Sequence, residues 1–278
     1  MKFLVLFFIL SSGVLVFATS KKASTIAKIP LSFRDPQKPG LVAEVVIKGQ
    51  KFRFLIDTGA SAHSIDRKVA EALGFSSAGD VQSSTPYGPG ELAHLGDVNI
   101  KVGSLPLILE GALSTPDDPG GLVSDGISGV ISPPRLSTHS FVVVDLKAPA
   151  LYFVQASPQN IWKWLENEFS GFDFDELNRL EPNSFQETIK VRSKEFGSLQ
   201  MFIDTGATTT ILHAKESSTS PKLMSLGIGH HQCETRNARI LPLNPEVKQN
   251  LLGMDCLRNK ILVFGPPSLP MVWMGWPK

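Results

Sequence analysis

The chain carries the same short motif twice. Residues 54–60 read Phe-Leu-Ile-Asp-Thr-Gly-Ala and residues 201–207 read Met-Phe-Ile-Asp-Thr-Gly-Ala, so the two aspartates, Asp57 and Asp204, lie 147 positions apart (204 − 57). An apolar run precedes each motif and a small polar stretch follows it. A repeat of this kind indicates a duplicated structural unit, which places the two aspartates in equivalent positions of the fold.

The similarity continues into the residues around each motif. A β-hairpin is predicted before each aspartate, because two segments rich in β-branched and aromatic residues flank a short turn. These segments are 41–47 and 51–56 in the first copy, and 184–192 and 199–203 in the second. A glycine-containing apolar segment and a β-rich tail follow each motif: 126–130 and 141–153 in the first copy, 251–254 and 260–272 in the second. The order recurs, so we predict an all-β fold of two duplicated lobes.

The segment between the two copies has a different character. Apolar residues such as Ile161, Trp162 and Leu165 recur at helical spacing after Ser157 and Pro158, which predicts a short amphipathic linker helix. A helix lying on a membrane surface is the alternative, but its polar face is too acidic for anionic lipid. The predicted organisation is a signal peptide at 1–18, an N-terminal β lobe at 19–156, a linker helix region at 157–183 and a C-terminal β lobe at 184–278.

The first residues resemble an export signal. A short basic start leads into an apolar stretch at 3–17 that ends near Ala18 with small residues, which is typical of a cleaved secretory signal peptide. The alternative is an uncleaved segment that tethers the protein to a membrane. We therefore expect an exported protein, periplasmic or extracellular. Its two cysteines, Cys233 and Cys256, are compatible with one disulfide or with two separate thiols.

Each residue type in the repeated motif suits acid–base chemistry. A carboxylate at the end of a buried strand is held in place by the sheet. The threonine hydroxyl, of Thr58 or Thr205, has the reach to cross to the opposite loop. Gly59 and Gly206 let the loops approach without a Cβ clash and leave an amide free to donate to the carboxylate. Two carboxylates that share one site cannot both ionise easily, so one of them keeps a proton.

These motifs resemble those of aspartic proteases. The two-lobed arrangement is similar to that of pepsin-like enzymes, and the local sequence motifs are similar to those of the retropepsin-like group. The residues that carry the resemblance are 54–61 and Leu251-Leu-Gly-Met-Asp-Cys-Leu-Arg258. The resemblance implies a pepsin-like acid protease fold, with Asp57 and Asp204 as the catalytic pair and a bound water as the nucleophile. It also implies that Thr58 and Thr205 cross-brace the two loops, and that 127–129 and 251–253 pass beneath them.

A further site element is expected in the first lobe. Tyr87-Gly88, followed by Pro89-Gly90, lies where such proteases carry the tip of a flap hairpin over the substrate. The alternative is a plain surface turn. The second copy is shorter, with 47 residues from Asp204 to Leu251 against 70 from Asp57 to Ile127, so no second full flap is expected there.

The chain departs from the pepsin-like pattern directly after each motif. Pepsin-like enzymes usually place Ser or Thr there, where a hydroxyl supports the ionised pair. Here both positions are alanine, Ala60 and Ala207. Loss of hydrogen bonds to the charged form raises a carboxyl pKa, so the expected activity optimum is less acidic than that of a digestive pepsin-like enzyme.

Other chemistries have weaker support. The net charge of +1 gives no basis for binding nucleic acid. His230 and His231, with Cys233 and His213, do not match a zinc spacing and are interpreted as loop residues, and we predict neither metal nor cofactor. His63 follows the first motif closely and is expected to be an exposed loop histidine; the alternative is a residue that lines the cleft. Trp273 and Trp276 are expected to pack.

The sequence thus predicts a monomeric aspartic endopeptidase that acts on polypeptides. Both motifs stand in one chain, so no second copy or obligate partner is needed to assemble the pair. The alternative is a catalytically silent peptide-binding protein of pepsin fold. Such proteins typically lose one aspartate or glycine of the pair, and here both motifs are intact.

Overall fold

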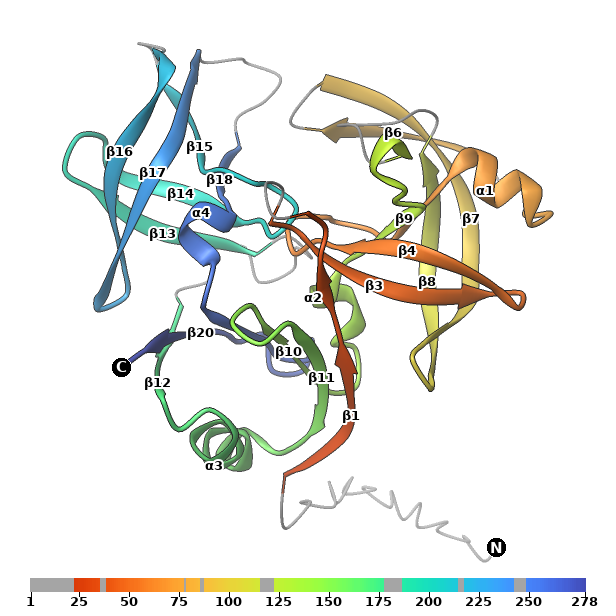
Figure 1. Cartoon of the computed structure of the whole chain (residues 1–278), viewed down its shortest axis with the longest axis horizontal. Helices are drawn as coiled ribbons and strands as arrows, with labels where there is room; N and C mark the ends of the chain where they lie inside the picture. The colour runs from red at the N-terminus through yellow and green to blue at the C-terminus, as the bar shows by residue number, and fades with distance from the viewer. Residues whose placement is uncertain are drawn as a thin grey trace, which may run out of the picture.

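Strands dominate the computed structural model, which describes residues 23–35, 39–77, 79–85, 88–115, 123–177, 187–214, 218–242 and 249–278. Two β barrels lie side by side, and a separate six-stranded sheet with one long helix lies beneath them (Figure 1). The predicted all-β, two-lobed fold is therefore confirmed. The predicted signal peptide and Tyr87 lie outside the described residues.

The first barrel holds the first copy of the motif. Its six strands, in barrel order, are β3 (Leu41–Ile47), β4 (Gln50–Ile56), β9 (Gly129–Ile131), β5 (Ser64–Asp66), β8 (Leu105–Thr115) and β7 (Gly88–Val102). Pairing of β3 with β7 closes the ring, while β2 (Ser32–Phe33) and β6 (Asp80–Thr85) extend it. The predicted hairpin before Asp57 is β3–β4, paired from Leu41↔Ile56 to Ile47↔Gln50.

The second barrel repeats this order. Its strands are β13 (Thr188–Ser193), β14 (Gly197–Ile203), β18 (Asn250–Leu252), β15 (Ile211–Ala214), β17 (His231–Pro242) and β16 (Ser218–Ile228). β15 and β17 run parallel, as β5 and β8 do in the first barrel. No strand among the residues described in this lobe corresponds to β6, so the β6–β7 hairpin belongs to the first lobe alone.

The pairing registers correct one expectation from the sequence. Ile56 and Ile203, which precede the two aspartates, pair with Ile131 and Leu252. The strand beneath the first motif is therefore β9 at Gly129–Ile131, two residues beyond the expected 127–129. In this register Ser132 of the first lobe corresponds to Gly253 of the second. The expectation aligned Gly129 with Gly253, whereas the strand pairing makes Asn250 the counterpart of Gly129.

The sheet beneath the barrels joins the two halves of the chain. Its strand order is β1 (Ser24–Pro30), β11 (Ala150–Gln155), β10 (Phe141–Asp145), β19 (Ile261–Phe264), β20 (Val272–Pro277) and β12 (Phe172–Glu176). β10 of the first half pairs antiparallel with β19 of the second, and every residue of both strands is buried. The β-rich tails predicted for the two copies therefore lie side by side in one sheet.

The linker helix covers one face of this sheet. α3 (Pro158–Glu168) begins after Ser157, as the sequence predicted, and buries Ile161 and Leu165. These two side chains belong to a core cluster with Trp273, which is fully buried. Trp276 is also buried, so both tryptophans pack as expected. Among the described residues, no helix combines the length and the apolar character that crossing a membrane requires.

The remaining helices are short, and two of them, α2 (Pro133–Leu136) and α4 (Met254–Leu257), lie at matching places in the two lobes, after β9 and β18. α1 (Arg67–Ala72) follows β5, and η1 (Val123–Asp125) is a single 3₁₀ turn. A disulfide between Cys233 of β17 and Cys256 of α4 ties the second barrel to its helix across 23 positions. The sequence had left this pairing open.

Candidate active site

The two aspartates stand at the ends of equivalent strands where the barrels meet. Asp57 follows β4, and its backbone N–H donates to the carbonyl of Ile131 at 2.9 Å. Asp204 follows β14, and its N–H donates to the carbonyl of Leu252 at 3.0 Å. Each aspartate loop is therefore anchored by the strand beneath it, so the carboxylates sit on rigid elements.

Thr58 and Thr205 connect the two loops directly. The hydroxyl of Thr58 donates to the carbonyl of Ile203 at 2.7 Å and accepts the N–H of Thr205 at 3.1 Å. The hydroxyl of Thr205 donates to the carbonyl of Ile56 at 2.8 Å and accepts the N–H of Thr58 at 3.1 Å. Both threonines are fully buried. These four hydrogen bonds fix the position of one loop relative to the other.

The glycines after the threonines occupy space that no side chain can share. A Cβ on Gly59 would lie 2.6 Å from Cγ of Asp204, and a Cβ on Gly206 would lie 2.6 Å from Oδ2 of Asp57. Each glycine N–H also donates to Oδ1 of its own aspartate at 2.8 Å. Glycine here therefore allows the close approach of the carboxylates and supplies a donor to each of them.

Burial and mutual interaction change the acidity of the pair. Desolvation raises the pKa of Asp57, while a hydrogen bond from Asp204 and backbone amides work against that rise. The pKa of Asp204 is raised well above its ordinary value, first by desolvation and then by the negative charge of Asp57. The two environments push the acidities apart, so Asp57 is the carboxylate that ionises first and Asp204 the one that keeps the proton.

The alanines after the motifs contribute only backbone donors to this site. The N–H of Ala207 donates to Oδ1 of Asp204 at 2.9 Å, and the N–H of Ala60 similarly supports Asp57. The methyl group of Ala60 packs against an apolar cluster that includes Val42 and Leu55. A hydroxyl that would stabilise the ionised form is absent from both positions, which is consistent with the raised pKa values of Asp57 and Asp204.

The flap expected near Tyr87 falls between strands β6 and β7. The two strands pair from Asp80↔Ala93 to Thr85↔Gly88, which leaves a two-residue connection at positions 86 and 87. Gly88 begins β7, whereas Tyr87 lies outside the described residues. The role of Tyr87 in a flap therefore stays a prediction from the sequence.

His63 is buried, contrary to the expectation of an exposed loop residue. Its side chain is 1% exposed, and its Nδ1 accepts the backbone N–H of Ser132 at 3.2 Å. The prediction was wrong because the residues that bury His63 are distant in sequence. The α2 segment, for example, begins about seventy positions later, and no local pattern announces such packing.

The histidines of the second lobe each make a different contact. The ring of His231 stacks on Trp276 with centroids 4.8 Å apart, while Nδ1 of His213 lies 3.2 Å from the carbonyl of Pro242. The N–H of His230 donates to Oδ2 of Asp175 at 2.8 Å. Within the described ranges, no three His, Cys, Asp or Glu side chains gather in a way that would hold a metal ion.

Sequence reasoning missed a hydrogen-bond network in the second lobe. Oδ1 of Asp255 accepts both the N–H and the hydroxyl of Thr210, at 2.8 and 2.7 Å, and its Oδ2 accepts the hydroxyl of Thr235. Thr210 in turn accepts the N–H of Gly253. Asp255 belongs to the retropepsin-like signature at 251–258, so the sequence did contain a signal for this network.

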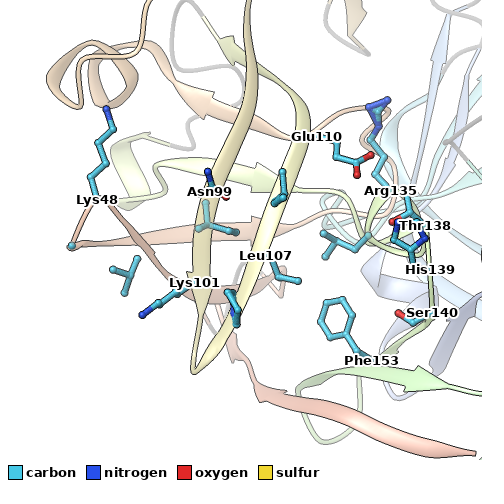
Figure 2. A pocket seen from close by; sticks show the side chains of 16 residues that line it. Lys48, Asn99, Lys101, Leu107, Glu110, Arg135, Thr138, His139, Ser140 and Phe153 are labelled. Carbon is cyan, nitrogen blue, oxygen red and sulfur yellow. The ribbon is translucent and has the colours of Figure 1, made fainter.

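A cavity of about 760 Å³ lies in the first lobe, away from the two aspartates. Strands β7 and β8 form one side, and the segment from Arg135 to Ser140 forms the other (Figure 2). Glu110 and Arg135 approach each other at its upper edge (Figure 2). Neither Asp57 nor Asp204 lines this cavity, so it is distinct from the site between the barrels.

Comparison with known proteins agrees with the geometry of the first lobe. Residues 43–130 match the family model described as aspartyl protease, a span that runs from β3 to β9 and includes Asp57. No curated protein matches the chain. The resemblance drawn from the repeated motif is confirmed, and it supports peptidase activity in general terms. Residues 43–130 are thus similar to an aspartyl protease.

Proposed function

We propose that the protein is an aspartic endopeptidase in which Asp57 and Asp204 hydrolyse peptide bonds through an activated water. The observation that carries this proposal is the buried pair of mutually hydrogen-bonded carboxyls, in which the pKa of both is raised and that of Asp204 is raised well above its ordinary value. Two groups arranged in this way supply one base and one acid in a single site. Metal or cofactor chemistry is not required for such a reaction.

The proposed reaction moves two protons in opposite directions. Ionised Asp57 takes a proton from the water as its oxygen attacks the peptide carbonyl carbon, and protonated Asp204 gives its proton to the carbonyl oxygen. The tetrahedral intermediate then breaks the C–N bond. The proton held by Asp57 passes to the leaving nitrogen, and Asp204 recovers its proton from the hydroxyl that it had protonated. Catalysis therefore needs Asp57 without a proton and Asp204 with one.

Digestion of a denatured protein across pH 3 to 7 tests this proposal. Wild type is expected to cut, and the double variant Asp57→Asn/Asp204→Asn is expected to leave the substrate intact. Binding of a peptide to both forms, measured by calorimetry, separates the protease from a silent peptide-binding protein. A wild type that binds peptide and cuts nothing at any pH would establish the binding protein instead.

The dependence of turnover on pH is expected to be bell-shaped and displaced from strong acid. Activity falls as pH drops through the raised pKa of Asp57, because the base becomes protonated. Activity falls on the alkaline side as pH rises through the still higher pKa of Asp204, because the acid is lost. A pH–kcat/KM profile with a single short peptide measures both limbs. A maximum in strong acid contradicts the expectation.

Tyr87→Ala is expected to lower turnover without unfolding the protein. The reasoning rests on the place of residue 87 at the tip of the β6–β7 hairpin in the lobe that carries Asp57. A flap residue that covers the substrate contributes to orientation and to exclusion of water. Steady-state kinetics together with a thermal melt provide the measurement. Unchanged kcat and KM would remove Tyr87 from the site.

We further propose that the enzyme acts as an exported monomer. The disulfide between Cys233 and Cys256 supports passage through an oxidising compartment, where such bonds persist. The placement of both aspartates in one chain supports a site that is complete without a second copy. Mass-spectrometric mapping of the mature N-terminus tests removal of residues 1–18 and distinguishes it from membrane tethering.

A further inference from the structure

The imidazole of His63 is linked to Asp57 through the backbone of two intervening residues. Its Nδ1 accepts the N–H of Ser132 at 3.2 Å. Ser132 directly follows Ile131, whose carbonyl accepts the N–H of Asp57 at 2.9 Å. The carbonyl of Ile131 and the N–H of Ser132 belong to the same peptide group. One rigid peptide plane therefore bonds to Asp57 on one side and to His63 on the other.

The second lobe makes the same link with a different residue. Thr210 stands six positions after Asp204, as His63 stands six positions after Asp57. Its hydroxyl accepts the N–H of Gly253 at 3.3 Å, and the carbonyl of the same peptide group, that of Leu252, accepts the N–H of Asp204. Both catalytic loops thus rest on a peptide group held from behind by a side chain at position six.

The two lobes differ in how much room surrounds that peptide. A Cβ on Gly253 would lie 2.4 Å from the backbone carbon of Thr209, so only glycine fits there. The corresponding residue in the first lobe is Ser132, which carries a Cβ and is fully buried. The loops behind the peptide must be spaced more widely in the first lobe. A longer acceptor, the imidazole, spans this greater distance.

We infer that His63 is a positioning residue of the proposed protease, which holds the peptide group between Ile131 and Ser132 and through it the backbone of Asp57. The role requires a free lone pair on Nδ1, because the partner is an N–H donor. The ring must therefore be neutral, with its proton on Nε2. In a protonated ring, Nδ1–H would face the N–H of Ser132. Two donors cannot form a hydrogen bond, so the peptide group would no longer be held.

The surroundings of His63 favour the neutral ring. Burial lowers the pKa of His63 to about 3, and the positive charge of Arg135 on α2 adds to this effect. Glu110 on β8 approaches Arg135 and acts electrostatically on that arginine (Figure 2). The acceptor state of His63 is thus maintained throughout the pH range in which Asp57 serves as the base.

Two substitutions of His63 separate its hydrogen-bonding role from its volume. His63→Leu fills similar space and offers no acceptor, so we expect kcat to fall roughly tenfold with little change in KM, as follows from leaving a buried N–H unpaired. His63→Asn keeps an acceptor near the position of Nδ1 and is expected to recover most of the loss. Thr210→Val is the matched control in the second lobe and is expected to resemble His63→Leu. An Asn variant as slow as the Leu variant, with both folded, would overturn the role.

Measurements that do not depend on turnover keep this inference separate from the proposed function. In wild type at pH 5, ¹⁵N spectra are expected to show His63 neutral with the proton on Nε2, and a protonated Nδ1 would overturn the inference by itself. The amides of Asp57 and Ser132 are expected to exchange with deuterium faster in His63→Leu than in wild type. Unchanged exchange in a folded Leu variant would also overturn it. These measurements test the role of His63 even if the protein cleaves no peptide.

The dependence of stability on pH gives a further readout. Below the ordinary histidine pKa of about 6.5, the unfolded chain binds a proton that folded His63 does not accept until about pH 3. The contribution of His63 to stability is therefore fully present above pH 6.5 and is lost as pH falls towards 3. Asparagine at position 63 does not titrate, so the His63→Asn variant does not lose this stability. Its melting temperature is therefore expected to rise relative to that of wild type as pH falls through this window. Parallel curves would contradict a neutral buried ring.

Discussion

Asp57→Asn and Asp204→Asn are each expected to reduce kcat for peptide hydrolysis about a thousandfold or more, because each removes one member of an acid–base pair. Asparagine at 57 cannot accept a proton from water, and asparagine at 204 cannot pass a proton to the carbonyl oxygen. The substitutions change few atoms and leave the hydrogen bonds between Thr58 and Thr205 in place. Kinetics with a fluorogenic peptide, after exclusion of contaminating protease by a mock purification, provide the measurement.

Stability gives these variants an internal control. The pKa values of both carboxyls are raised on folding, so the folded chain holds more protons than the unfolded chain above the ordinary carboxyl pKa. The free energy of unfolding therefore decreases as pH rises through that window. The asparagine variants escape this loss and are expected to melt at a higher temperature than wild type at pH 7. A variant that is inactive and more stable has lost chemistry and not structure. Residual activity near the wild-type level would refute the assigned pair.

Gly206→Ala is expected to lower kcat about a hundredfold, since a displacement near 1 Å at the reacting groups has an effect of this order. The new Cβ would lie 2.6 Å from Oδ2 of Asp57, so the carboxylate or the loop must move. Gly59→Ala is expected to act in the same way, because its Cβ would meet Asp204. The expected effect comes from contact with the aspartates and not from a loss of backbone freedom, because neither glycine has a positive φ angle.

Gly171→Ala is the matched control for these glycine variants. This residue is exposed in the turn before β12, and a Cβ there would meet no atom within 4 Å. Its kinetics and melting temperature are expected to stay close to those of wild type. If Gly206→Ala and Gly171→Ala had equal kcat values, the close approach of the two loops would not matter for turnover.

The parts of this molecule that the sequence predicted are those governed by local pattern. The hairpins before Asp57 and Asp204 follow from alternating β-branched residues, and the start of α3 follows from Ser157 and Pro158. The close packing at Gly59 was also foreseeable, because two carboxylates at one site leave no room for a side chain. For the hairpins and the helix start, neighbours in sequence supply the physical cause, whereas the packing at Gly59 follows from the repetition of the motif.

The features that escaped prediction depend on residues that are distant in sequence. His63 is buried by α2, and its role as an acceptor is set by the backbone of Ser132. The strand beneath Asp57 was misplaced by two residues, because register is fixed by pairing between strands and not by the position of a glycine. The sheet shared by β10 and β19 was not foreseen either, since each strand alone reads only as a buried apolar run.

The pairing of β10 with β19 means that neither half of the chain is self-sufficient. These two strands are neighbours at the centre of the six-stranded sheet, and all their residues are buried (Figure 1). If the halves were made as separate polypeptides, each would expose a mainly apolar edge strand, which is a template for association. We expect each fragment alone to self-associate or aggregate along that edge. Produced together, the fragments are expected to recombine into a working enzyme, as in a split-protein reporter.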